Sequence, residues 1–272
     1  MDPVQGISFS GGTLLGYSLI AAVCLLIPAA AIFLMRKYNA VRLLPVITGA
    51  VFYLLFTRFN DIFITLFFPR MPFSQRMLAA VETIAVFEEI GRYLALKMPI
   101  SQVDRSSAAV CLGIGHAGAE CLLRAVRTFR VIGYGLRLNS SGTEAFLSGK
   151  SDLSAQAITQ TLQQYADQGF LTGLAEAVQH VTNFGFHIAL TLLIYRKMFV
   201  TDDRKRWLAL AVLLHYMMNC IPHLASLTGS NFFAALTGIG TGTGIMLLVS
   251  RLIDGRAVLD EIRYPLSFDA PA

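Results

Sequence analysis

Charged residues are scarce in this sequence. They make up 14% of its 272 residues, whereas an ordinary soluble domain contains about 25%. Hydrophobic residues make up 55%, and the mean hydropathy is +0.59. This composition argues against an ordinary soluble domain and predicts a single integral-membrane domain over residues 1–272.

Cysteine and long basic runs are also sparse. The four cysteines all fall in apolar segments and form no CxxC pair, which predicts small packing residues and no disulfide framework. The net charge of +5 comes from short clusters beside apolar segments, so it indicates membrane topology and gives no reason to expect a nucleic-acid partner. The N-terminus lacks the basic start of a cleavable signal peptide, and we expect its first apolar segment to be a retained helix.

Long apolar segments are abundant, and a membrane-spanning helix needs about 20 such residues. We predict an all-α, polytopic transmembrane bundle with about seven membrane helices. The candidates are Gly12–Met35, Val41–Thr57, Met77–Leu96, Ser106–Val126, Phe170–Tyr195, Trp207–Leu227 and Phe232–Leu252. The second is ambiguous, because the apolar stretch Phe59–Phe68 follows it: it is either one long tilted helix or a span followed by an interfacial piece.

The only long polar connector covers about residues 139–169. Its middle has rough helical spacing after the capping-type residues Ser151 or Asp152, which predicts an amphipathic surface helix between the fourth and fifth membrane helices. This helix would be a lid or substrate platform, or else a solvated connector. Residues 265–272 are expected to form a short disordered tail.

Lysine and arginine residues favour one orientation. More of them flank the segment ends on one side than on the other, which predicts an external N-terminus and a cytoplasmic C-terminus. The arginines between Arg124 and Arg137 oppose this assignment.

Ionisable side chains interrupt several apolar segments. Inside a bilayer each costs about 2.5–3.5 kcal/mol, so such groups persist mainly where they pair or function. Residues four apart share a helix face, which pairs Glu88 with Arg92 and His116 with Glu120. We expect the polar stripes of four helices to turn inward together, because a stripe that faces lipid leaves its polar groups without partners. The stripes are Glu82, Glu88, Glu89 and Arg92; His116, Glu120 and Arg124; Glu176, His180, Asn183 and His187; and His215, Asn219 and His223.

This set of side chains suits two chemistries. A carboxylate beside histidines can activate water for hydrolysis while His or Asn donors stabilise an oxyanion. The same groups could bind Zn²⁺, which favours imidazole nitrogen and carboxylate oxygen. A lone intramembrane histidine such as His180 or His223 more often forms a hydrogen bond between helices.

Glycines accompany both the polar segments and the last helix. Gly113, Gly115 and Gly118 surround His116 and would bring its imidazole close to a neighbouring helix. The glycine-rich stretch 238–244 lacks a preceding strand and a Lys-Ser/Thr ending, so it is no phosphate-binding loop. Gly238 with Gly242, and Gly240 with Gly244, fit the small-xxx-small pattern of tight helix contacts. Gly49 and these glycines would suit dimer contacts or internal packing equally, which leaves the oligomeric state open.

The order of the polar motifs resembles that of the YhfC family of membrane peptidases, which look like distant relatives of the CAAX prenyl proteases and bacteriocin-processing (CPBP) proteins. The matching pieces cover the third to the sixth membrane segment. They are Glu88-Glu89-Ile-Gly-Arg92, Gly115-His116-Ala-Gly-Ala-Glu120, Phe186-His187-Ile-Ala-Leu190 and His215-Tyr-Met-Met-Asn219. In the broader group the first motif often reads EE-x-x-x-R. Here Arg92 comes one residue earlier, so the resemblance leaves open which glutamate it partners.

The resemblance implies a glutamate-dependent intramembrane endopeptidase, with a metal-free or a metal-assisted mechanism, in a bacterial plasma membrane. Its substrate would be a membrane-embedded or lipid-modified peptide or protein. Glu88 or Glu89 with His116 would hold and activate water, His215 and Asn219 would supply oxyanion donors or help to hold a metal, and His187 would be a further member. The predicted site is Glu88, Glu89, Arg92, His116, Glu120, His187, His215 and Asn219, with Zn²⁺ as the candidate cofactor.

Two other functions remain open. A proton-coupled transporter could use the Glu and His stripes as a relay, although the sequence has no evident inverted repeat. A non-catalytic scaffold could use the polar cluster to bind a lipid or a partner protein.

Overall fold

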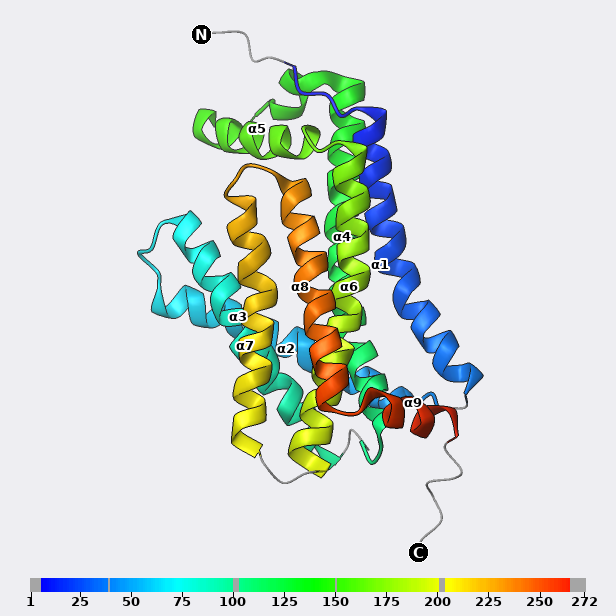
Figure 1. Ribbon diagram of the computed structural model, residues 1–272. Coiled ribbons are helices and arrows are strands. Elements are labelled where there is room, and N and C mark those ends of the chain that lie inside the picture. Colours follow the sequence, from blue (N-terminus) through cyan, green and yellow to red (C-terminus); the bar gives the residue numbers. More distant parts are fainter. Residues whose placement is uncertain (1–5, 39, 100–102, 150, 201–203, 265–272) are drawn as a thin grey trace, which may run out of the picture.

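The described structure is entirely helical, which confirms the predicted all-α fold. The computed structural model describes residues 6–38, 40–99, 103–149, 151–200 and 204–264; the predicted tail at 265–272 lies outside these ranges. The elements are α1 (Gly11–Lys37), α2 (Leu43–Phe67), α3 (Phe73–Lys97), α4 (Ser106–Leu147), α5 (Asp152–Ala166), α6 (Phe170–Ile194) continued by the π-helix η2 (Tyr195–Val200), α7 (Arg204–Ser226), α8 (Asn231–Leu252) and α9 (Gly255–Arg263) (Figure 1).

Six helices among the described residues are long and apolar enough to cross a membrane. They are α1, α2, α4, α6 with η2, α7 from Arg206, and α8. The predicted third span, Met77–Leu96, does form a helix within α3 but is not among the six. Its lower hydropathy reflects the charged residues that it carries, among them Glu88, Glu89 and Arg92.

The ambiguous second segment is one long helix. α2 has 25 residues in all and continues past Arg58, Asn60 and Asp61 to Phe67, as the long-helix alternative predicted. Asn60 is buried; its Nδ2 donates to the carbonyl of Ala80 at 3.2 Å and its Oδ1 accepts from Thr83 at 2.6 Å. These bonds satisfy a polar group within the bundle and fix α2 against α3. The turn that joins the two helices projects from the side of the bundle (Figure 1).

The central helix α4 is longer than the predicted span. It runs for 42 residues from Ser106 to Leu147, with a kink at Gly142, whose φ of 78° favours glycine. Its beginning is held by Glu261 of α9, which accepts from Ser106 N at 2.9 Å and from Ser106 Oγ at 2.8 Å. α4 packs against α1, α2 and α6, so residues on several of its faces are buried.

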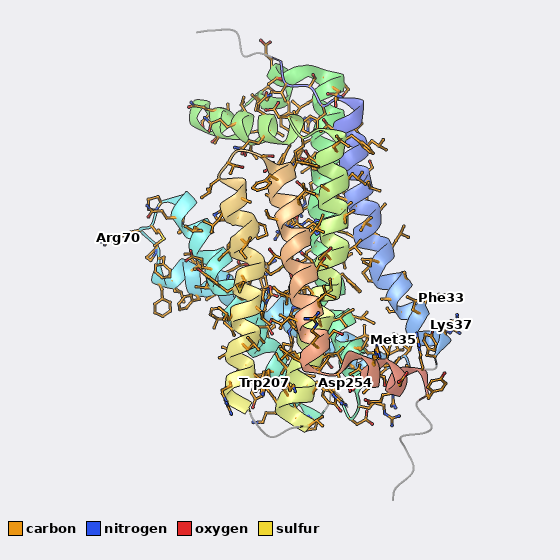
Figure 2. The ribbon with its side chains drawn as sticks, viewed as in Figure 1. Phe33, Met35, Lys37, Arg70, Trp207 and Asp254 are labelled. Atoms are coloured by element: carbon orange, nitrogen blue, oxygen red, sulfur yellow. The ribbon has the colours of Figure 1, made fainter. Side chains whose placement is uncertain are left out.

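Two short helices lie across opposite ends of the bundle (Figure 1). The predicted amphipathic helix forms as α5, and Ser151 caps it by accepting from Ser154 N. Leu162 of α5 is buried, and the ring of Tyr165 meets that of Tyr17 on α1. α9 lies at the other end, beside Asp254 (Figure 2), and packs against α4 and α8. Much of the predicted connector is therefore helical and packed.

Glycines allow two helix crossings to be very close. A Cβ at Gly49 of α2 would collide with the Leu112 carbonyl, and one at Gly115 of α4 with the Val46 carbonyl. A Cβ at Gly113 would meet Ile188 of α6 at 2.9 Å. As predicted for the glycines around His116, these crossings bring its imidazole between neighbouring helices.

The glycines of α8 divide into two sets. A Cβ at Gly238 would collide with Gln179 of α6, and one at Gly242 would meet Thr182 of α6 at 2.6 Å. At Gly240 and Gly244 a Cβ would meet nothing within 4 Å in the described part of the chain. Only the first small-xxx-small pair therefore serves a helix contact inside this chain.

Candidate metal and catalytic centre

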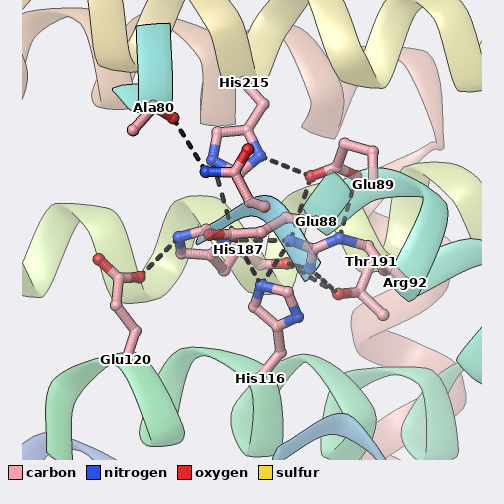
Figure 3. Close-up of polar contacts among 10 residues, drawn as sticks. Ala80, Glu88, Glu89, Arg92, His116, Glu120, His187, Thr191 and His215 are labelled. Atoms are coloured by element: carbon pink, nitrogen blue, oxygen red, sulfur yellow. Dashed lines mark hydrogen bonds and ion pairs between the residues drawn. The ribbon is translucent and has the colours of Figure 1, made fainter. Parts of the chain in front are cut away.

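Four helices bring their ionisable side chains to one buried centre. α3 contributes Glu88, Glu89 and Arg92; α4 contributes His116 and Glu120; α6 contributes His187; and α7 contributes His215 (Figure 3). All except Glu120 are buried. The structure thus places seven of the eight predicted residues in direct contact with at least one other member of the set.

Arg92 binds Glu89, which corrects the expected pairing of Arg92 with Glu88. Arg92 Nε donates to Glu89 Oε2 at 3.0 Å, and an Nη donates to Oε1 at 3.2 Å. The second Nη donates to the His187 carbonyl at 2.8 Å and to Thr191 Oγ1 at 2.6 Å. A guanidinium has its donors in a planar fork that matches a carboxylate, and this fork meets the residue three positions back. Arg92 therefore joins α3 to α6 and neutralises Glu89.

Glu88 contacts two histidines instead of Arg92. Its Oε2 lies 3.1 Å from His116 Nε2 and 3.8 Å from His215 Nε2. Those two imidazoles are its ion-pair partners among the described residues. A buried carboxylate is costly unless a proton or a positive charge balances it, so Glu88 needs a proton, a protonated imidazole or a bound cation. Of the two adjacent glutamates, Glu88 is thus the one available for chemistry.

His187 and His215 each have one ring nitrogen fixed by a carboxylate. His187 Nε2 lies 2.8 Å from Glu120 Oε2, while its Nδ1 lies 3.0 Å from an Nη of Arg92. His215 Nδ1 lies 2.7 Å from Glu89 Oε1. Carboxylates accept protons in hydrogen bonds, so Nε2 of His187 and Nδ1 of His215 carry the hydrogens. The other nitrogens, Nδ1 of His187 and Nε2 of His215, keep their lone pairs.

His116 Nε2 has two incompatible neighbours. It lies 3.2 Å from an Nη donor of Arg92 and 3.1 Å from the acceptor Glu88 Oε2. If Nε2 accepts from Arg92, its lone pair and a carboxylate oxygen face one another at hydrogen-bond distance. Three arrangements resolve this conflict: a hydrogen on Nε2 that is donated to Glu88, a proton on Glu88, or a cation between the two atoms.

The donor set fits a metal ion. Glu88, His116 and His187 each offer a ligand atom, and these atoms lie within 4.8 Å of one another. A tetrahedral zinc ion with bonds of about 2.0–2.1 Å separates its ligand atoms by about 3.3 Å, close to the 3.1 Å between Glu88 and His116. Glu120 on the far nitrogen of His187 is the carboxylate–histidine arrangement that orients metal ligands. The residues therefore fit a zinc-type ion.

A cavity of about 260 Å³ opens onto this centre. Glu88, Glu120, His187 and His215 line it, together with Asn219 one turn beyond His215. Asn219 thus reaches the centre through the cavity and not through a contact with the other members. The cavity gives a reacting molecule access to Glu88 while Glu89 stays fully buried.

Other members of the predicted stripes lie away from the centre. Glu82 is exposed and His223 half-buried, so the inward turn predicted for the four stripes holds for the members at the centre and not for these two residues. Glu176 and His180 line a neighbouring cavity. Residues further along each helix lie away from the point where the four helices cross, so only the members nearest that point reach the centre.

Sequence reasoning missed two neighbours of the centre. Thr191 accepts from Arg92 and donates to the His187 carbonyl at 2.8 Å; it lies four residues after His187, a spacing that could have indicated it. Tyr53 of α2 meets the His116 ring edge-on, with 4.9 Å between ring centroids. No sequence pattern links Tyr53 to His116.

The structure is a helical membrane bundle with carboxylates and imidazoles around one cavity, an arrangement that suits hydrolysis or metal binding. A family model described as YhfC intramembrane metalloprotease matches residues 23–237, and the chain belongs to that family. The match includes every residue of the centre and confirms the resemblance in the motifs. It also identifies the chain as an integral membrane protein of an intramembrane protease family. No curated protein and no solved structure matches the chain.

Proposed function

We propose that the protein is a metal-dependent intramembrane endopeptidase that hydrolyses a peptide bond in a membrane-embedded or lipid-modified substrate. The observation that carries the proposal is the separation of Glu88 from Glu89. Arg92 neutralises Glu89, while Glu88 faces a cavity with His116 and His215.

Glu88, His116 and His187 would hold the ion. When bound, a zinc-type ion makes a hydroxide-like nucleophile available near neutral pH and polarises a carbonyl oxygen. Glu120 orients His187 through its Nε2 hydrogen. Nδ1 would then be the ligand atom, and it would exchange its hydrogen bond from Arg92 for the ion.

His215 is placed to move protons. Glu89 fixes the hydrogen of His215 on Nδ1, so that Nε2 presents its lone pair 3.8 Å from Glu88. From there Nε2 can take a proton from the attacking water and return it to the leaving amine. Asn219 lines the same cavity and supplies amide hydrogens for the negative oxygen that develops on the substrate carbonyl.

The test combines metal content with cleavage. Detergent-purified wild type should contain close to one equivalent of metal, and His116→Ala and His187→Ala should lose it while they remain folded. Vesicles that contain the protein and a mixture of synthetic single-span peptides should release cleavage products, detected by mass spectrometry. His215→Ala should retain metal but slow cleavage by about 100- to 10,000-fold, the usual contribution of a general base.

Either of two results would overturn the metal-dependent proposal. One is a folded, active wild type without metal, which would make Glu88 the general base of a metal-free glutamate mechanism. The other is full cleavage by Glu88→Gln, which would remove Glu88 from the chemistry. A folded protein that binds metal and cleaves no peptide would favour a non-catalytic role instead.

A further inference from the structure

A series of three cavities runs along α6 from the candidate centre toward α5. The site cavity shares Arg124 and Asn183 with a second cavity of about 200 Å³, which lies among α4, α6, α7 and α8. The second cavity shares Asn231 with a third, of about 510 Å³, at the α5 end of the bundle. Shared lining residues make these three cavities neighbours along one route, called the passage below.

The passage is polar along its length. The third cavity is lined mainly by uncharged polar side chains, including Gln164, Gln168 and Ser230. Glu176 and Gln179 of α6 line the second cavity, and Gln168 Nε2 donates to Glu176 Oε1 at 2.9 Å where the two cavities approach. Gln164 and Asp167 are exposed at the end of the bundle, whereas a polar side chain deeper in the bundle, such as Glu176, costs free energy unless it pairs or meets a polar ligand.

The passage has the dimensions of an extended peptide. Thr172 lines the third cavity and His187 the first, and fifteen residues of helix separate them by about 22 Å. An extended chain covers this distance with about six or seven residues at about 3.3 Å per residue. The smallest of the three cavities, of about 200 Å³, is larger than the roughly 10–15 Å³ that a single water needs.

Asn183 stands where the first and second cavities meet. It lines both, and its Oδ1 is buried without a hydrogen-bond partner. An Asn amide offers an acceptor and two donors, which is the complement of a peptide group. A peptide unwound for cleavage in a membrane needs partners for its backbone, and rotation of the Asn183 amide can present either end to it.

We infer that the passage binds the substrate as an extended polypeptide segment of about six residues on one side of the cleaved bond, with the Asn183 amide hydrogen-bonded to a substrate backbone amide. This inference rests on the proposed endopeptidase function and identifies where its substrate lies. Asn183 is a substrate-positioning residue and takes no part in proton transfer. Its neighbour Thr182 faces α8, where its methyl group meets Gly242.

The experiment measures binding separately from turnover. The full chain carrying Glu88→Gln, in detergent, is titrated against a fluorescein-labelled single-span peptide of Ala and Leu with a Gly-Gly centre. A set of peptides in which one backbone amide at a time is replaced by an ester probes each substrate N–H. One ester within six residues of the centre should weaken binding by about three- to tenfold, the range of one hydrogen bond.

The Asn183 variants decide the assignment. Asn183→Leu in the Glu88→Gln background should weaken binding of the all-amide peptide to the same extent and abolish the ester effect. Thr182→Val, the matched control on the adjacent face, should keep both. Asn183→Ala is measured alongside, because it removes the amide without added bulk if the leucine variant fails to fold.

The outcomes separate this inference from the function on which it rests. Two results would overturn the passage as a peptide-binding site and leave it as a route for water. One is that every ester peptide binds as tightly as the all-amide peptide, and the other is that the ester effect persists in both Asn183 variants. Cleavage by the wild type together with either result would leave the endopeptidase proposal intact. If the ester effect depends on Asn183 but the wild type cleaves no peptide, the passage is supported as a peptide-binding site and the proposed endopeptidase function is overturned.

Discussion

Arg92 donates to both carboxylate oxygens of Glu89, and Glu88, the preceding residue, is held by His116 and His215. Two adjacent glutamates therefore have different environments. One forms a neutralised ion pair that is fully buried, and the other faces a cavity. This asymmetry underlies the first prediction below.

Glu89→Gln should destabilise the protein far more than Glu88→Gln. Removal of the Glu89 charge leaves the Arg92 guanidinium buried without its counter-ion, which costs about 3–5 kcal/mol. Glu88→Gln removes a buried carboxylate that has no cationic partner, so the free energy of unfolding should fall little or even rise. Thermal unfolding in one detergent compares the two variants, and equal losses of stability would contradict the assigned pairing.

Glu120→Gln should weaken metal binding without abolishing it. Glu120 contacts His187 Nε2 at 2.8 Å, and loss of such an orienting carboxylate typically lowers metal affinity by about 10- to 100-fold. Competition with a zinc chelator measures the change. Glu82→Gln, at an exposed position of α3, is the matched control and should bind metal as the wild type does.

Gly49→Ala and Gly115→Ala should both destabilise the bundle. Each added methyl group would collide with a backbone carbonyl of the partner helix, and backbone cannot move aside as a flexible side chain can. Overpacking of this kind costs about 1–3 kcal/mol. It should also lower metal content, because α4 carries His116 one residue after Gly115.

Gly240→Ala is the control for the glycine variants. A Cβ there meets nothing within 4 Å in the described residues, and alanine is favoured over glycine within a helix by about 1 kcal/mol. We expect an unchanged or slightly raised melting temperature. A loss of stability equal to that of Gly115→Ala would contradict the close crossing as the cause, because helix propensity favours alanine at both positions.

Glu261→Ala should loosen the beginning of α4. Glu261 accepts from both Ser106 N and Ser106 Oγ and lies 3.4 Å from Arg196. Loss of a side chain that caps a helix costs about 1 kcal/mol. Hydrogen exchange should accelerate over the first turn of α4 and in α9. The exposed neighbour Asp260, changed to Ala, should leave exchange in α4 unchanged, and equal acceleration in both variants would contradict the capping role.

Much of the fold could be predicted from local pattern. Apolar length predicted the membrane helices, and Ser151 with the spacing of Leu162 and Tyr165 predicted α5. Two predictions failed for different reasons. α3 carries too many charges to qualify as an apolar span. α4 continues past its apolar part, because hydropathy alone does not set the length of a helix.

The sequence by itself determined that this is a helical membrane protein and which residues compose the polar centre, because hydropathy and four-residue spacing are local properties of the chain. Only the tertiary structure decided that Arg92 neutralises Glu89, that Glu88 faces the cavity, and that Asn183 lies on a passage toward α5. Those facts depend on the rotation and crossing of helices far apart in the sequence. Close glycine contacts at Gly49 and Gly115 set the α2–α4 crossing, and no single helix carries that information.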